Sequence, residues 1–214
     1  MIRLAMRLLG AGAVLALAAC ASAPLHYYTL MAPADESAGG LMASADGSVS
    51  NAAAMSLPFE LLPVSVPPQV DQPQLVVREG GQGVALLGSE RWIAPLGDEV
   101  RGALSADLAR ELRSQDVSGL PGNGRPLLRI KLDLRRFDSQ PGSYALIEGA
   151  WSVRLLHDTH AGTLACTSRV SVPVGPGYPA LVQGHQQAIA RLAGQIAAAG
   201  RLLGSGQTPV CPAS

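Results

Sequence analysis

The residues with the clearest chemical potential lie at the end of the N-terminal segment. Leu17, Ala18 and Ala19 directly precede Cys20. Small residues let an extended backbone enter a peptidase cleft, and the cysteine thiol can carry a thioether-linked diacylglycerol. This order is typical of a bacterial lipobox. It predicts cleavage between Ala19 and Cys20 and lipid attachment at Cys20.

The segment before Cys20 has the features of a secretory signal. Arg3 and Arg7 give a positive beginning, and residues 8–19 are apolar and uncharged. A permanent bilayer span needs roughly 20 apolar residues, so this run is too short for one. We expect residues 1–19 to be a lipoprotein signal peptide. The alternative is an ordinary signal peptide that is cut elsewhere and happens to contain a cysteine.

Lipid attachment would fix the compartment. One acyl chain holds a protein only marginally, whereas two or more hold it stably, and a bacterial lipoprotein would carry three on Cys20. Ala21 follows, rather than the aspartate that resembles an inner-membrane retention signal. We therefore expect the outer membrane, periplasmic face. Removal of the signal peptide leaves 14 of the 16 basic side chains against 16 acidic ones, which disfavours simple electrostatic adhesion to anionic lipid.

Cys166 and Cys211 are the other reactive pair. In an oxidising periplasm two remaining cysteines tend to form a disulfide. This bridge would close a loop of about 46 residues and contribute about 4 kcal/mol in the chain-entropy model. The alternative is a buried thiol at Cys166 and a frayed tail at Cys211.

The sequence gives little support for metal binding, catalysis or nucleic-acid binding. His157 and His160 flank Asp158 and Thr159 in a turn-rich stretch, and a metal site would need further converging ligands. The chain has no G-x-S-x-G nucleophile elbow and no phosphate loop. Equal numbers of basic and acidic side chains, 16 each, give no electrostatic footprint for nucleic acid. We expect no enzyme activity, no metal, no cofactor and no nucleic-acid partner.

Hydrophobic spacing predicts the elements. Apolar residues recur every three or four positions in residues 93–112 and 179–203, which indicates two amphipathic helices. Strict alternation in residues 126–138 indicates a half-buried strand. Residues 31–56 are small and polar and are expected to form a flexible linker or long loop. Further strands are expected at 27–30, 59–66, 74–79, 83–88, 144–156 and 163–174.

This order predicts an α+β fold, with one largely antiparallel or mixed sheet of six to seven strands and two amphipathic helices packed on one face. Residues 20–58 would comprise the lipid anchor, a short first strand and the Ala/Gly/Ser-rich loop, and residues 59–214 the folded domain. Trp151 is expected in the core. Trp92 precedes a helix and is expected in the core or at a partner contact.

Ordered stretches along the chain resemble a known family. They run from the lipobox and residues 27–30 through residues 64–76 and 91–96 to residues 137–138, 149–151 and 177–193. The sequence is similar to the auxiliary lipoproteins of ABC-type lipid transport systems, the PqiC/YmbA group. That resemblance implies a non-catalytic subunit that holds the outer-membrane end of a system for membrane integrity. Its partners would be an MCE-domain protein, an inner-membrane permease and an ATPase, and a homo-oligomer is a further candidate state.

A second reading competes with the first. The chain could be a stand-alone periplasmic lipid-binding carrier lipoprotein, whose own cavity holds an acyl chain. A periplasmic hydrolase is a third hypothesis, which lacks a recognisable nucleophile arrangement.

Overall fold

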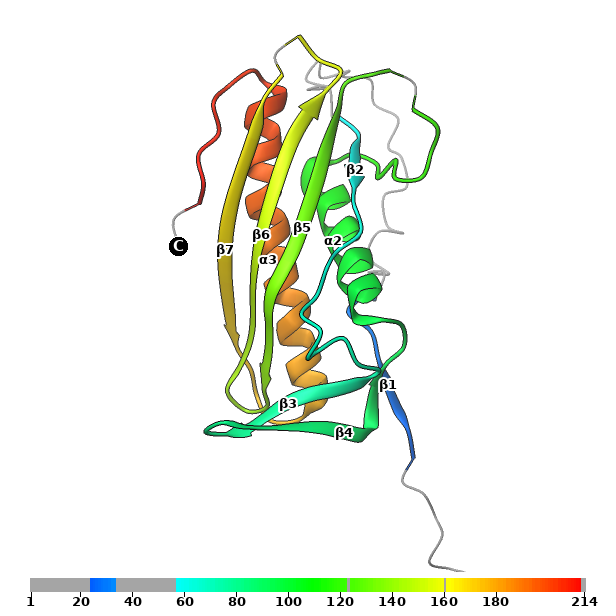
Figure 1. The fold of residues 1–214 in the computed structure, drawn as a ribbon, viewed down its shortest axis with the longest axis vertical. Helices are drawn as coiled ribbons and strands as arrows, with labels where there is room; N and C mark the ends of the chain where they lie inside the picture. Colours follow the sequence, from blue (N-terminus) through cyan, green and yellow to red (C-terminus); the bar gives the residue numbers. More distant parts are fainter. Residues whose placement is uncertain (1–23, 34–56, 123, 160, 213–214) are drawn as a thin grey trace, which may run out of the picture.

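The computed structural model describes residues 24–33, 57–122, 124–159 and 161–212. Within them, seven strands form two sheets, accompanied by two helices (Figure 1). Ala19, Cys20, most of the predicted loop at 31–56 and His160 lie outside the described residues. In chain order the elements are β1 (His26–Tyr28), β2 (Phe59–Leu61), β3 (Gln74–Gly80), β4 (Gly83–Trp92), α2 (Leu96–Leu112), β5 (Leu127–Gln140), β6 (Tyr144–Leu156), β7 (Thr163–Pro173) and α3 (Tyr178–Gly204).

The larger sheet has four strands in the order β2-β5-β6-β7. β5, β6 and β7 are antiparallel neighbours, and β2 runs parallel to β5. Along β5, Leu128, Ile130 and Leu132 are buried while Arg129 and Lys131 are exposed. This alternation gives the sheet one apolar face, and both helices lie on that side (Figure 1).

The smaller sheet has three strands in the order β1-β4-β3 and lies across one end of the molecule (Figure 1). β3 and β4 form an antiparallel hairpin, and β1 adds to β4 in parallel. The α+β class, the strand number and the two helices are confirmed, but the strands divide between two sheets instead of forming one. Hydrophobic alternation shows which face of a strand is buried but does not specify which edges pair.

The strand predicted at residues 59–66 is shorter in the structure. β2 ends at Leu61, and one further bridge joins Ser65 to Asp133 of β5. Pro63 lies between them and has no N–H to donate to a ladder, so regular pairing stops there. β2 is also an edge strand, which is the position that tolerates such an interruption.

The two helices close the core as their apolar spacing predicts. Val100, Leu104 and Leu108 of α2 are buried, as are Leu192 and Ile196 of α3. The carboxylates of Asp98 and Glu99 lie in the first turn of α2, where they complement the positive end of the helix dipole. All five apolar side chains belong to one core that both sheets share.

An aromatic stack joins the smaller sheet to β5 and α3. The Phe137 ring packs edge-on against Trp92, with centroids 6.0 Å apart, and lies flat on His185 at 3.9 Å. His185 is fully buried, and its Nε2 is 2.7 Å from Ser139 Oγ. Burial lowers the pKa of His185 to about 3, against an opposing effect of Asp138.

The buried His185 should make the fold sensitive to acid. Above pH 6.5 the imidazole is neutral in both the folded and unfolded chain, so its contribution is fully present. Below pH 6.5 only the unfolded chain takes up the proton, so stability falls by about 1.4 kcal/mol per pH unit until the pH approaches 3. In His185→Gln, the free energy of unfolding measured in urea between pH 7 and pH 4 should fall less steeply than in the wild type. The difference in slope should be about 1.4 kcal/mol per pH unit, which is the contribution of one proton. Parallel curves for wild type and variant would contradict this assignment.

Candidate functional site

The N-terminal segment, residues 26–30, is the part of the described chain that connects Cys20 to the body. Its strand β1 pairs in parallel with β4, with His26 opposite Glu90 and Tyr28 opposite Trp92. The N–H of Ile93 donates to the Tyr28 carbonyl at 2.9 Å. Three residues of pairing alone are a weak attachment, so side chains must hold the segment in place.

Glu90 is the first of two buried carboxylates that bind this segment. Its oxygens accept a hydrogen bond from the Tyr28 hydroxyl at 2.7 Å and lie 2.9 Å from His26 Nδ1, and Ser89 Oγ donates at 3.1 Å. The contacts with His26 and Tyr28 lower the pKa of Glu90, although burial opposes them. Burial and the bond to Glu90 raise the pKa of Tyr28 to about 12. At neutral pH the pair is therefore a carboxylate and an intact hydroxyl donor.

Glu99, in the first turn of α2, is the second carboxylate. It accepts hydrogen bonds from the Leu30 backbone N–H at 2.7 Å and from Thr29 Oγ1 at 2.8 Å. The Leu30 side chain is only 1% exposed and belongs to the shared core. Gln186 of α3 donates to the Thr29 carbonyl at 3.2 Å. The segment is thus fastened to β4, α2 and α3 together.

The oxygens of Glu90 and Glu99 accept the hydrogen bonds of the N-terminal segment, so they serve as attachment points. In the described ranges, no group of three or more His, Cys, Asp or Glu side chains could hold a metal ion. His157 lies just after β6 with a φ of 57°, which fits the predicted turn.

A third buried carboxylate, Asp138, joins the two sheets. Arg78 of β3 donates through Nε to Asp138 Oδ1 at 2.5 Å, and Arg136 donates to Oδ2 at 2.6 Å. Burial raises the pKa of Asp138, but the two arginines outweigh it and leave the pKa lowered. Sequence reasoning missed Glu90, Glu99 and Asp138, because nothing local distinguishes them from solvated acidic residues.

The structure places the Trp92 side chain in the core, which is one of the two positions expected for it. Trp92 is 6% exposed and packs on Phe137, so it offers no surface to a partner. The neighbouring Ile93 is 67% exposed. Trp92 therefore belongs to the core, as Trp151 does; Trp151 donates through Nε1 to Ser168 Oγ at 2.9 Å.

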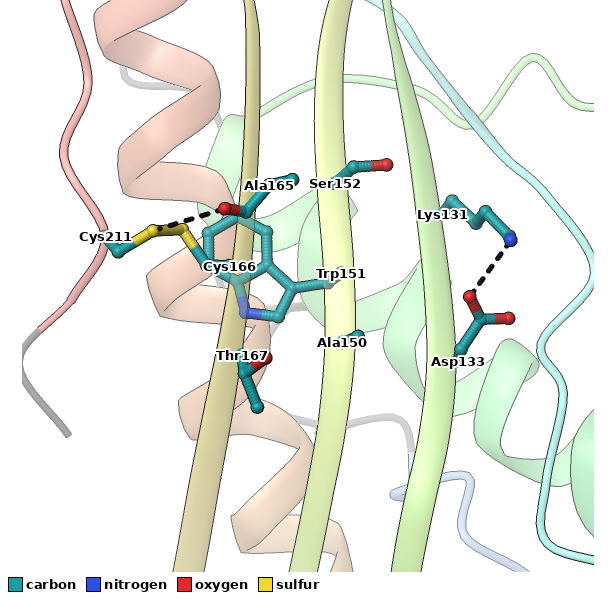
Figure 2. A pocket seen from close by; sticks show the side chains of 9 residues that line it. All are labelled: Lys131, Asp133, Ala150, Trp151, Ser152, Ala165, Cys166, Thr167 and Cys211. Atoms are coloured by element: carbon teal, nitrogen blue, oxygen red, sulfur yellow. Dashed lines mark hydrogen bonds and ion pairs between the residues drawn. A yellow bond between two sulfur atoms is a disulfide. The ribbon is translucent and has the colours of Figure 1, made fainter.

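A shallow hollow of about 490 Å³ lies over β5, β6 and β7 (Figure 2). Its lining includes Ala150, Ser152 and Thr167, with the Lys131–Asp133 ion pair at 3.0 Å on one side. The small side chains make the sheet surface low at this point. The lining residues of this hollow include no histidine.

Comparison with known proteins identifies the family. The model of the family described as "ABC-type transport auxiliary lipoprotein component" matches residues 40–197. The chain belongs to this family. The predicted family is therefore confirmed, and the protein is an auxiliary lipoprotein component of an ABC-type transport system. No curated protein sequence matches this auxiliary lipoprotein.

Solved structures share the fold of this auxiliary lipoprotein. A crystal structure of an uncharacterized protein aligns with a TM-score of 0.60 at 17% identity, covering 82% of this chain and 98% of that one. Protein XCC0632 from Xanthomonas campestris, a DUF330 protein, aligns with a TM-score of 0.52 at 16% identity, covering 70% and 86%. Across the ranges that the structure describes, no helix is long and apolar enough to cross a bilayer.

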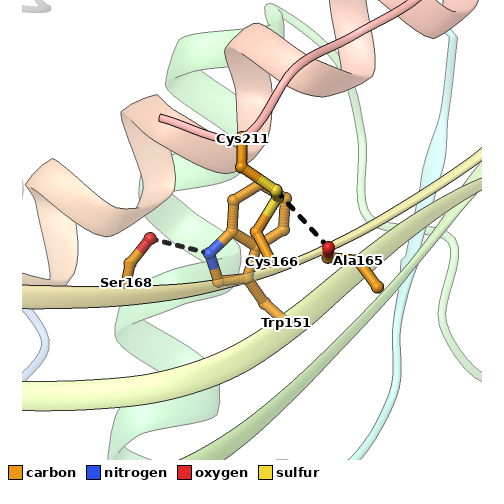
Figure 3. The surroundings of a disulfide bond; sticks show 5 residues. All are labelled: Trp151, Ala165, Cys166, Ser168 and Cys211. Atoms are coloured by element: carbon orange, nitrogen blue, oxygen red, sulfur yellow. Dashed lines mark hydrogen bonds between the residues drawn. A yellow bond between two sulfur atoms is a disulfide. The ribbon is translucent and has the colours of Figure 1, made fainter. Parts of the chain in front are cut away.

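The C-terminal tail of the auxiliary lipoprotein is joined to β7 by a disulfide between Cys166 and Cys211, whose Cα atoms are 5.6 Å apart (Figure 3). The bridge lies beside Trp151 and Ser168 (Figure 3). Cys211 lies beyond the end of α3 at Gly204 and outside the matched residues 40–197. The disulfide is therefore the covalent link between the tail and the sheet.

Removal of this link is expected to lower stability. The variant Cys166→Ala with Cys211→Ala should lose about 4 kcal/mol of unfolding free energy, because the unfolded chain regains the freedom of the closed loop. Urea unfolding with and without a thiol reductant measures it. Reductant should destabilise the wild type and leave the variant unchanged; thiol-specific labelling of both cysteines in the unreduced, unfolded wild type would contradict the bridge.

Loss of the buried side chain of the N-terminal segment should destabilise the whole domain. Leu30→Ala leaves a cavity in the shared core and should cost about 2–5 kcal/mol, measured by urea unfolding with tryptophan fluorescence. The matched control is Leu120→Ala, at a leucine that is 66% exposed, which should change stability by less than about 0.5 kcal/mol. Equal effects of the two changes would mean that residues 26–30 are not part of the cooperative fold.

Proposed function

We propose that this auxiliary lipoprotein is a non-catalytic subunit of an MCE/ABC-type lipid transport system of the PqiC/YmbA group. It is anchored by acylated Cys20 to the periplasmic face of the outer membrane. There it docks an MCE-domain protein that spans the periplasm and works with an inner-membrane permease and ATPase. The cargo is phospholipid, and the role is maintenance of the envelope. The family match over residues 40–197 is the observation that carries the proposal.

The attachment of the N-terminal segment supports a role for the anchor. Five residues, 21–25, separate Cys20 from β1, and an extended chain spans at most about 3.6 Å per residue, or about 18 Å in all. Because Glu90 and Glu99 bind the segment to β4 and α2, a lipid on Cys20 would hold the folded body close to the leaflet. A docking subunit needs this fixed position.

The hollows on the described surface bear on the alternative of a stand-alone lipid carrier. Hollows on the described residues have volumes of about 170, 230, 260 and 490 Å³. The 490 Å³ hollow is lined partly by Lys131, Asp133, Ser152 and Thr167, which are poor partners for a hydrocarbon chain. A carrier needs a deep and mainly apolar site that covers most of its ligand. The 490 Å³ hollow does not have that character.

The test uses tagged full-length protein in cells that carry the transport system. Wild type should incorporate labelled palmitate, fractionate with the outer membrane and copurify the MCE-domain protein from detergent extracts. Cys20→Ser should incorporate no palmitate and move largely to the soluble periplasm, because it loses its stable anchor. Cys211→Ser is the matched control and should keep the label, since it changes a cysteine that has no predicted lipid.

Two results would contradict the proposal. Palmitate labelling of the Cys20→Ser variant would exclude Cys20 as the lipid site. Failure to recover the MCE-domain protein, together with a phospholipid that stays bound to the purified chain in native mass spectrometry, would favour the carrier instead.

A further inference from the structure

Exposed apolar side chains gather on one face of the smaller sheet. In β4, Ala85 and Leu87 pack inward on a small cluster that includes Leu181 of α3, so the alternating Val84 and Leu86 point outward. Both outward side chains are more than half exposed. The β3–β4 hairpin therefore buries one face and presents the other to the surroundings.

The same outward face continues across β1. Tyr28 turns inward to Glu90, so Tyr27 points outward, opposite Arg91 of β4. Eight large hydrophobic side chains in the described residues are exposed, and five of them lie on or beside this sheet, with exposures from 49% to 67%. They are Leu25, Tyr27, Val84, Leu86 and Ile93. Scattered surface hydrophobics would not concentrate on one small element in this way.

Arginines predominate among the charged groups on and beside this face, and Arg78 and Arg136 are ion-paired with the carboxylate of Asp138. Arg91 lies among the apolar residues, and its Nε has only a long contact of 3.4 Å to the Gly88 carbonyl; no carboxylate pairs with it in the described chain. Arg135 lines a hollow of about 170 Å³ together with Val84 and Leu86, and the lining also includes the Arg136–Asp138 ion pair. The acidic Glu79 is exposed at the end of β3, where the pairing with β4 is irregular.

We infer that this outward face of the three-stranded sheet is a second membrane contact, which rests on the leaflet that holds the acylated Cys20. The inference rests on the proposed anchorage. Leu25 is the first exposed apolar residue of the face, and at most about 18 Å of extended chain separates it from Cys20. Apolar and tyrosyl side chains with arginines among them suit the lipid head-group region, where anionic phosphates meet hydrocarbon.

This contact determines how the folded domain is oriented on the membrane more than whether the domain stays attached to it. The mature chain has more acidic than basic residues, so the whole surface is not attracted to anionic lipid, and the acyl chains supply the stable hold. The smaller sheet, however, lies across one end of the long axis (Figure 1). With that end on the leaflet, the turn between β6 and β7 at the opposite end points into the periplasm, toward a partner that spans it.

The test places a tryptophan on the face of the acylated, full mature protein in nanodiscs of phosphatidylethanolamine and phosphatidylglycerol. Leu86→Trp should lose at least half of its added fluorescence when the lipids carry bromine on their acyl chains. Leu120→Trp is the matched control, since Leu120 is also more than half exposed but lies outside this sheet, and its added fluorescence should not change. Native Trp92 and Trp151 are buried, and the wild-type signal is subtracted. Adding Arg91→Glu to Leu86→Trp should weaken the quenching at least twofold.

The outcomes separate this inference from the proposed function. Acylated protein whose Leu86→Trp fluorescence is unquenched overturns the membrane contact and leaves the anchor intact. If that fluorescence is also shielded from acrylamide when the MCE-domain protein or further copies are added, the face is a protein interface instead. A mature chain without acyl groups, seen by mass spectrometry before reconstitution, overturns both proposals.

Discussion

The structure depends on two buried carboxylates that hold the N-terminal segment. A carboxylate out of water is costly unless hydrogen bonds satisfy it, and Glu90 and Glu99 find their donors in residues 26–30. The dependence is mutual, because removal of the segment would leave both charges buried without their main partners. For this reason the short β1 strand is part of the fold and not a loose leader before it.

Because the N-terminal segment is attached at the smaller sheet, the two ends of the molecule differ. The smaller sheet, with β1 at its edge, forms one end, and Asp138 with its two arginines fixes that sheet to β5. The aromatic stack of Trp92, Phe137 and His185 fills the interior between them. A rigid connection from the N-terminal segment to the helices suits a subunit whose task in our proposal is to hold a position rather than to perform a reaction.

Local patterns predicted most of the elements. The apolar spacing of Leu104 and Leu108 placed α2, and the alternation along Leu128 to Leu134 placed β5, because both periods are set by backbone geometry. The pairing of edges was not predictable in the same way. Nothing in residues 74–92 showed that this hairpin would leave the main sheet and lie across its end.

The sequence by itself determined the motif at Cys20, the family resemblance and the α+β class, since each is carried by neighbouring residues or by a repeating period. Only the tertiary structure decided the division into two sheets, the burial of Trp92 and the partners of Glu90, Glu99 and Asp138. These features join residues about 60 to 70 positions apart, and such contacts depend on how complete elements pack. A buried acidic residue and a solvated one look alike until the chain that covers them is in place.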